Sequence, residues 1–257
     1  MIANASPSTN NPPSPLSRRD LLAVVGSLAA LTLLAWAYLA YLAGAMPAMT
    51  AMTEPRVWNP AEALAGFLMW TVMMAGMMLP SASPMILLFS RLQGGGTGKW
   101  PRTATFVGGY LLVWTAFSAA ATALQWGLQW LGLLASTGLT HPAVGGAVLV
   151  GAGLYQFTTV KQACLAHCQS PVGFLMFHWR SGTRGALQMG LSHGGYCLGC
   201  CWVLMLILFV GGVMNLLWAA GLAALTLVEK VVPAGPWLAR AAGLALVAAG
   251  VLLAVPA

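Results

Sequence analysis

Charged side chains are scarce in this sequence of 257 residues. Asp, Glu, Lys and Arg together make up only 6% of it, and the acidic residues number four, whereas a soluble domain is about 25% charged. Hydrophobic residues make up 59%. A chain of this composition cannot cover its surface with charge. The composition therefore excludes an ordinary soluble protein and predicts an integral membrane protein.

Several classes of site are excluded by what else is missing. The few acidic residues are scattered along the sequence, so they do not supply a carboxylate pair for acid–base catalysis. The sequence contains no Ser-His-Asp arrangement, phosphate-binding loop or dinucleotide-binding fingerprint. Its five cysteines fall into two short motifs rather than a disulfide framework. We therefore predict no catalytic residue and no organic cofactor, and we favour a binding protein over an enzyme.

Seven apolar stretches separated by short polar segments occupy most of the chain. Because a spanning helix needs roughly 20 apolar residues, seven helices leave no room for a soluble domain. We predict an all-α polytopic transmembrane helix bundle with a single helical domain over residues 18–257. A tail rich in Pro, Ser and Asn over residues 1–17 is predicted to be disordered. The predicted spans are residues 21–42, 62–89, 104–131, 143–160, 185–209, 213–229 and 237–256.

The fifth and sixth spans are separated only by Gly211-Gly212, and no charge interrupts residues 186–228. Such a run is too long for one span, so a tight turn at the two glycines is expected. A six-span bundle, in which two of these helices are fused, is the alternative. It fits the distribution of basic residues less well.

Basic residues indicate how the bundle is oriented. With seven spans and a cytoplasmic N-terminus, ten of the eleven Lys and Arg residues fall on the cytoplasmic side and only Arg56 falls outside. This asymmetry follows the positive-inside rule and is not typical of nucleic-acid binding. The predicted cytoplasmic residues are Arg18, Arg19, Arg91, Lys99, Arg102, Lys161, Arg180, Arg184, Lys230 and Arg240.

The segment from His193 to Cys201, HGGYCLGCC, contains three of the five cysteines and one of the four histidines. On a helix, Cys197, Cys200 and Cys201 fall with His193 within an arc of about 100°. Polar groups at membrane depth are costly and usually face protein. Cysteine is also a small residue suited to helix interfaces, but this grouping favours a metal site.

A second motif, CLAHC, places Cys164, His167 and Cys168 at i, i+3 and i+4 of an expected helix. We predict it at the cytoplasmic end of the fourth span, where Lys161 lies three residues upstream. Two thiolates and an imidazole suit Cu(I) or Zn²⁺. A reduced cysteine pair without a ligand is the alternative.

Methionine is concentrated between Met46 and Met85, which contains nine of the fourteen. Met46, Met49 and Met52 fall in the first outer loop, where methionine has little packing to do. A second set lies within an arc of about 80° on the second expected span, which Pro80 and Pro84 are expected to kink. Thioethers are soft ligands that favour Cu(I). The second set consists of Met69, Met73 and Met77.

Several segments resemble a bacterial family of predicted metal-binding integral membrane proteins, domain-of-unknown-function family 2182. They are MWTVMMAGMMLPS, KQACLAHCQSP, WRSGTRGALQMG, HGGYCLGCCWVLM and GGVMNLLW, and the resemblance covers about residues 60–235. It implies a metal site at the motif cysteines with His193 beside them. One departure is at residues 158–160, where the family pattern has a proline, so the local helix end stays open.

We therefore expect a multi-pass protein of the bacterial inner membrane that binds a soft metal and transfers, transports or inserts it. Copper(I) is the expected metal and zinc the alternative, since zinc leaves the methionines unexplained. A metallochaperone or metalloenzyme is the expected protein partner, besides the lipid bilayer. Two other functions fit: a membrane thiol–disulfide oxidoreductase that uses the CxxCC cysteines, and a structural subunit in which a metal pins helices together.

Overall fold

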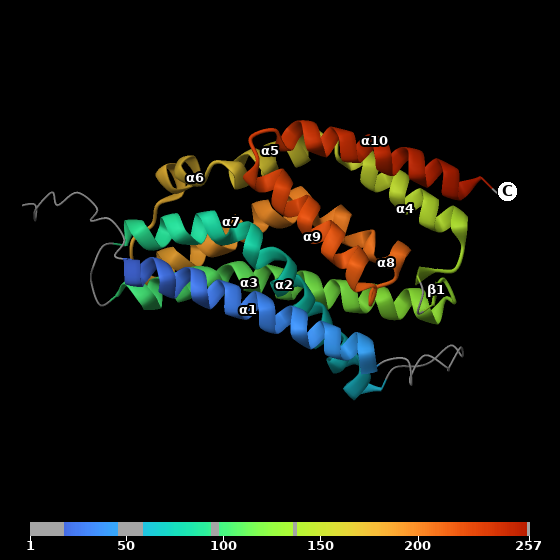
Figure 1. Ribbon diagram of the computed structural model, residues 1–257, viewed down its shortest axis with the longest axis horizontal. Helices are drawn as coiled ribbons and strands as arrows, with labels where there is room; N and C mark the ends of the chain where they lie inside the picture. The colour runs from blue at the N-terminus through green and yellow to red at the C-terminus, as the bar shows by residue number, and fades with distance from the viewer. Residues whose placement is uncertain (1–17, 46–58, 94–97, 136–137, 256–257) are drawn as a thin grey trace, which may run out of the picture.

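The computed structural model describes residues 18–45, 59–93, 98–135 and 138–255, and most of its helices run along one common axis (Figure 1). The predicted tail 1–17 and the outer methionines Met46, Met49 and Met52 lie outside the described residues. The elements are α1 (Arg18–Ala45), α2 (Pro60–Leu92), α3 (Lys99–Trp130), β1 (Leu134–Ala135), β2 (Gly138–Leu139), α4 (Pro142–Tyr155), α5 (Thr159–Gln169), α6 (Pro171–His178), α7 (Gly182–Leu206), α8 (Leu208–Gly211), α9 (Leu216–Val231) and α10 (Gly235–Ala254).

The fold is all-α apart from one pair of two-residue antiparallel strands, β1 and β2. Five helical stretches are long and apolar enough to cross a membrane: α1, α2, α3, α7 with α8, and α10. The prediction of an all-α bundle with apolar spans is confirmed for the described residues. Seven spans are not confirmed, because α9 has only 16 residues and α4 and α5 form one bent pair.

The expected fourth span is interrupted. Helix α4 ends at Tyr155, and α5 begins at Thr159 in a direction 63° away. Thr158 has an extended backbone, and its hydroxyl accepts a hydrogen bond from the Lys161 amide at 3.3 Å, which caps the new helix. The helix end left open by the departure at residues 158–160 is therefore a bend. It directs α5, and the cysteines it carries, towards α7.

The glycine pair after α8 forms the expected turn. Gly212 has a φ of +88°, a backbone conformation that favours glycine. Asn215 then caps α9, since its side-chain oxygen accepts a hydrogen bond from the Trp218 amide at 3.1 Å. The chain reverses here, so that α9 returns beside α7 and α2 and brings its last turn to the cysteines (Figure 1).

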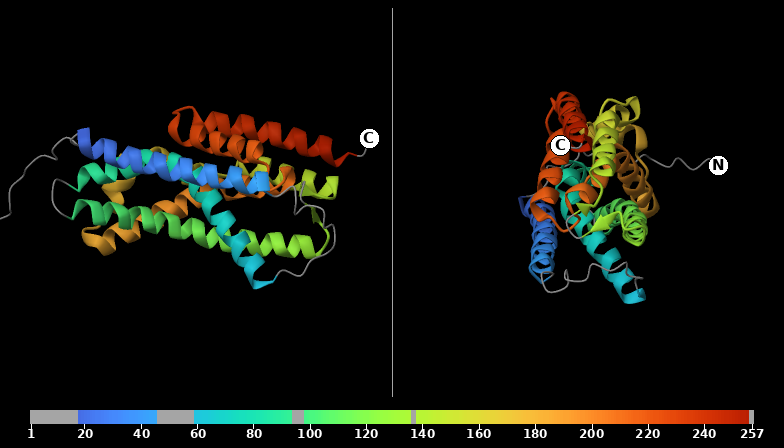
Figure 2. Two further views of the ribbon diagram at one scale, coloured as in Figure 1. Left: turned by 60° about the horizontal axis from the view of Figure 1, so that its bottom comes forward. Right: turned by 90° about the vertical axis from the view of Figure 1, so that its right-hand side faces the viewer.

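Helix α2 changes direction along its length and crosses the bundle obliquely (Figure 2). It contains Pro80 and Pro84, each of which removes one hydrogen bond of the helix. The hydroxyl of Ser83 donates to the Pro80 carbonyl at 2.8 Å, which replaces the bond that Pro84 cannot make. The expected kink therefore has a clear cause, and it lies next to the candidate site.

Glycines set the spacing between α3 and α7. A Cβ atom on Gly109 would lie 2.6 Å from the Leu187 carbonyl oxygen, and one on Gly190 would collide with the Phe106 carbonyl. Small residues of this kind allow the backbones of membrane helices to approach closely. The close approach places His193 and Cys197 of α7 against Tyr110 of α3.

The outer helices expose apolar side chains. On α1, Leu22, Leu33 and Tyr41 are about 70% exposed, and on α10 Trp237 and Leu252 are more than 70% exposed. Continuous exposed apolar faces are unusual on soluble monomers and mark surfaces that contact lipid or protein. The charged groups discussed below lie instead inside the bundle.

Candidate metal centre

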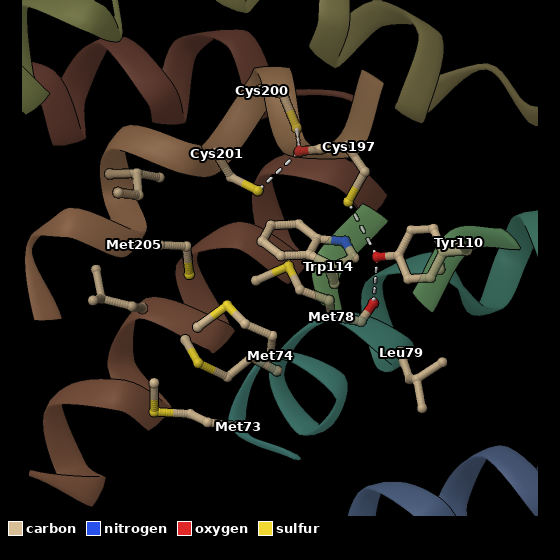
Figure 3. Packing of buried hydrophobic residues seen from close by; sticks show 14 of the residues in the cluster. Met73, Met74, Met78, Leu79, Tyr110, Trp114, Cys197, Cys200, Cys201 and Met205 are labelled. Atoms are coloured by element: carbon tan, nitrogen blue, oxygen red, sulfur yellow. Dashed lines mark hydrogen bonds between the residues drawn. The ribbon is translucent and has the colours of Figure 1, made fainter. Parts of the chain in front are cut away.

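Helix α7 carries all three cysteines of the HGGYCLGCC motif on its inner side. Cys197, Cys200, Cys201 and the preceding His193 are all at least 97% buried. Figure 3 shows Cys197 and Cys201 facing side chains of α2 and α3, whereas the Cys200 sulfur lies beside Cys168 of α5. The predicted common buried face of the motif is therefore present in the structure.

The Cys197 sulfur lies among donor groups from two other helices. The ammonium group of Lys230, on α9, donates to it at 3.0 Å. The Tyr110 hydroxyl, on α3, lies 3.1 Å from the same sulfur and also 3.1 Å from the carbonyl oxygen of Met78 (Figure 3). Cysteine binds metals as the thiolate, and this sulfur lies within hydrogen-bonding distance of a cationic group.

The other two cysteines of the motif are held differently. The thiol groups of Cys200 and Cys201 donate to the Cys197 carbonyl oxygen at 3.1 and 2.9 Å. Their S–H groups are thus satisfied by the backbone of their own helix. Cys201 also lies 3.8 Å from the ammonium group of Lys230, so Cys197 and Cys201 share one cationic neighbour.

Lys230 is 94% buried and reaches into a sulfur-rich space. Besides the two cysteines, its ammonium group lies 3.2 Å from the Ser81 hydroxyl and 3.9 Å from the Met78 thioether, both on α2. A buried charge is stable only where its hydrogen bonds are made and an opposite charge is near. We call Cys197, Cys201, Met78, Lys230 and Tyr110 the sulfur centre.

The second cysteine motif joins the first rather than forming a distant site. The Cys168 sulfur lies 4.0 Å from the Cys200 sulfur. Cys164 packs against Gly199, where any larger residue would meet its sulfur. The 63° bend before α5 produces this arrangement, since a straight helix would continue away from α7. Cys164 is only half-buried, whereas the other four cysteines are buried, so Cys164 is the most accessible cysteine of the two motifs.

The two predicted histidine ligands lie in different surroundings. His193 is buried beside the rings of Tyr110 and Phe106, and its Nδ1 atom has no hydrogen-bond partner within the described residues. An unsatisfied buried nitrogen is costly and suits a ligand role. His167 instead stacks on Tyr196, with ring centroids 4.2 Å apart, and its Nδ1 lies 2.9 Å from the Ala163 carbonyl. His167 lines a shallow pocket beside α6.

The methionines of α2 are buried in the core. Met78, one residue beyond the predicted ridge, makes the contact with the sulfur centre. Four buried methionines from α2 and α7 lie in the same region as Cys197 and Cys201. They are labelled in Figure 3: Met73, Met74, Met78 and Met205. The predicted ridge of Met69, Met73 and Met77 is buried as well.

Sequence reasoning missed the charged groups of the site. Lys161 and Lys230 had been placed with the interfacial cytoplasmic residues, but both are buried. The ammonium group of Lys161 binds the Glu229 carboxylate at 2.7 Å. In the sequence, each of these lysines lies at the end of an apolar segment. A lysine at the membrane interface has the same sequence context, so the two cases could not be distinguished.

Across the part of the chain that the structure describes, no three or more Cys, His, Asp or Glu side chains converge closely enough to hold a metal ion. A metal at the sulfur centre would therefore have few ligands of these types, with thioethers beside them. Low coordination by soft sulfur ligands suits Cu(I) better than Zn²⁺, which prefers four ligands.

Comparison with known proteins agrees with this chemistry. A family model described as PpoB2, copper chaperone, matches residues 67–253, well over half of the chain. No curated protein and no solved structure matches the chain significantly. The match supports a copper-related family, while the family name expected from the sequence resemblance stays a prediction.

Proposed function

We propose that this chain, which belongs to the PpoB2 copper chaperone family, is an integral membrane protein that binds Cu(I) at the sulfur centre and passes it on. The observation that carries the proposal is the buried meeting of Cys197, Cys201 and Met78 around one ammonium group. Thiolate and thioether sulfur are the ligands that select Cu(I). Family membership supports copper as the cargo.

The membrane location is supported by the outer surface of the bundle. Five helical stretches have the length and apolar character of spans, and α1 and α10 leave most of their apolar side chains uncovered. In lipid these side chains would need no protein partner. We propose the inner membrane of a bacterium as the location, in keeping with the sequence resemblance.

The arrangement of sulfur suggests a route for the ion. From Met69 to Met78, α2 rises about 14 Å, with buried methionines along the way. The route would continue to Cys197 and Cys201, then to the neighbouring Cys200–Cys168 pair, and leave at Cys164, which is half-exposed. Thiolates bind Cu(I) more tightly than thioethers, so the step from the methionines to the cysteines would be downhill. Met46, Met49 and Met52 would be the entry ligands.

The proposal is tested by copper binding in detergent. Protein is loaded with Cu(I) without oxygen, excess metal is removed, and bound copper is measured by elemental analysis and X-ray absorption. We expect copper with sulfur neighbours in the unaltered protein. A Cys197→Ser/Cys200→Ser/Cys201→Ser variant should lose most of it, because oxygen is a poor ligand for Cu(I). Equal copper in both proteins would overturn the proposal.

A control distinguishes loss of ligands from loss of fold. The single variants Cys197→Ser and Cys200→Ser each replace one sulfur by oxygen, about one helical turn apart. Of these two cysteines, only Cys197 contacts Lys230 among the described hydrogen bonds. Copper should fall more in Cys197→Ser, while circular dichroism and elution volume match the unaltered protein.

The same preparations also address the other functions considered. A membrane thiol–disulfide oxidoreductase would turn over disulfides without metal, and the 4.0 Å between Cys168 and Cys200 makes these the pair to monitor. A structural subunit would bind metal but transfer none to an acceptor. Transfer of Cu(I) to a chelator or apo-chaperone therefore separates a chaperone from both.

A further inference from the structure

Lys230 has an environment unlike that of a lysine in an ordinary buried ion pair. Its ammonium group contacts two cysteine sulfurs, a thioether and the Ser81 hydroxyl. The carboxylate beside it in sequence, Glu229, is directed to Lys161 at 2.7 Å and Gln156 at 3.3 Å. Among the ion pairs of the described residues, none includes Lys230. Its charge is therefore available to balance sulfur.

The Cys197 and Cys201 sulfurs differ in their hydrogen bonds. Cys201 bonds to a backbone carbonyl of its own helix at 2.9 Å. Cys197 has no such bond to its own helix among those described and accepts from Lys230 at 3.0 Å. The net charge of this buried centre therefore includes the Lys230 ammonium group and whatever the sulfurs bind. Neutrality matters because an uncompensated charge in the interior is strongly destabilising.

A monovalent ion makes the occupied centre neutral. Cysteine binds metals as the thiolate. Two thiolates, one Cu(I) and the Lys230 ammonium group therefore sum to zero charge. A divalent ion at the same two thiolates would leave one uncompensated positive charge.

A third thiolate would restore neutrality for a divalent ion, but the structure does not place one. The Cys200 sulfur lies 4.0 Å from Cys168 and has no contact with Lys230 among those described. Within the described chain, no three cysteine or histidine side chains converge.

We propose that Lys230 determines the specificity of the sulfur centre, by making it a site for soft monovalent ions and against soft divalent ones. This inference rests on the proposed function, because it assumes that Cys197 and Cys201 bind the cargo. Lys230 acts through its charge and is not itself a ligand. It remains hydrogen-bonded to the Cys197 thiolate while that sulfur binds the ion.

Silver(I) and cadmium(II) provide a suitable test, because both prefer sulfur and neither changes oxidation state under these conditions. The affinities of both ions are measured by competition in detergent. The dissociation constant for Cd²⁺ is divided by that for Ag⁺, and this ratio is divided by the same ratio for a free dithiol; we call the result the normalised preference for Ag⁺. For the unaltered protein it should be well above one. In Lys230→Met it should fall on the order of a hundredfold, because one nearby positive charge is lost.

Two further variants separate charge from shape. Lys230→Arg keeps the charge and should retain most of the preference for Ag⁺. Arg240→Met removes a positive charge from an exposed position and should leave the preference unchanged. An unchanged preference in folded Lys230→Met, or an equal change in Arg240→Met, would overturn the inference.

The measurement on the unaltered protein decides the question if Lys230→Met does not fold. A normalised preference equal to that of the free dithiol would overturn the role of Lys230, even though the protein binds Cu(I) as proposed. Absence of Cu(I) binding would instead overturn the proposed function itself. The two failures are therefore distinguishable.

Discussion

The surroundings of Lys161 and those of Lys230 are two buried polar regions that use the same side chain differently. Lys161 is fully buried and forms a closed ion pair with Glu229, whose other carboxylate oxygen accepts from Gln156. Lys230 is almost as buried, but the hydrogen-bond partners of its ammonium group among the described residues are sulfur and hydroxyl groups. The Lys161–Glu229 ion pair connects two helices. The Lys230 ammonium group instead contacts sulfur atoms that we propose as metal ligands, so its charge can affect metal binding.

The two regions are separated although Glu229 and Lys230 are consecutive. Neighbouring residues on a helix point in directions about 100° apart and do not face each other. Glu229 is therefore directed to α5 and Lys230 to α2 and α7. One turn of α9 thus fastens the bent α5 helix in place and also supplies the charge of the sulfur centre.

The largest effect is expected from breaking the ion pair between Lys161 and Glu229. Lys161→Met leaves the Glu229 carboxylate buried without its partner, which costs about 3–5 kcal/mol. Thermal unfolding in detergent should show a clear loss of stability. The double variant Lys161→Met/Glu229→Gln removes both charges and should recover most of the loss. A single variant as stable as the unaltered protein would show that the pair has no structural role.

A smaller effect is expected from removing the Tyr110 hydroxyl beside the Cys197 sulfur. Tyr110→Phe removes the hydroxyl that lies 3.1 Å from both the Cys197 sulfur and the Met78 carbonyl. We expect a loss of about 1 kcal/mol in stability and a several-fold weaker affinity for Cu(I), measured by competition with a chelator. Gln156→Ala near Lys161 should leave the affinity for Cu(I) unchanged. A similar loss of affinity in both variants would mean that the two regions are not independent.

The smallest expected effect concerns the thioether. Met78→Leu keeps the volume of the side chain, so stability should change by less than about 1.5 kcal/mol. The Met78 sulfur lies 3.9 Å from the Lys230 ammonium group. Loss of this sulfur should weaken Cu(I) binding a few-fold and make the ion dissociate faster. Met176→Leu is the matched control, since Met176 is 75% exposed on α6. Equal copper affinity in the two variants would exclude Met78 as a ligand.

Much of the candidate site could be predicted from local patterns. The spacing of His193, Cys197, Cys200 and Cys201 already placed them on one helical face, and all four are buried. Periodicity is a local property, so it does not depend on how the helices pack. The turn at Gly211-Gly212 was predictable for the same reason, because an apolar run of that length must reverse.

The predictions that failed or were incomplete depended on packing. The bend between Tyr155 and Thr159 converts the expected end of the fourth span into a helix that crosses to α7. It brings Cys168 to Cys200, which are 32 residues apart in sequence. Met78 lies one residue outside the predicted ridge but makes the contact with Lys230, because the packing of α2 against α9 decides which methionine reaches the site.

The amino-acid sequence by itself determined that this protein is a helical bundle rich in apolar spans and that soft sulfur ligands occur in two motifs and a methionine-rich helix. Those features follow from composition and from periodicity along one helix. Only the tertiary structure decided that the two cysteine motifs meet and that Lys230 contacts Cys197 and Cys201 of one of them. A buried lysine and an interfacial lysine look alike in sequence, because the free energy that separates them comes from groups on other helices.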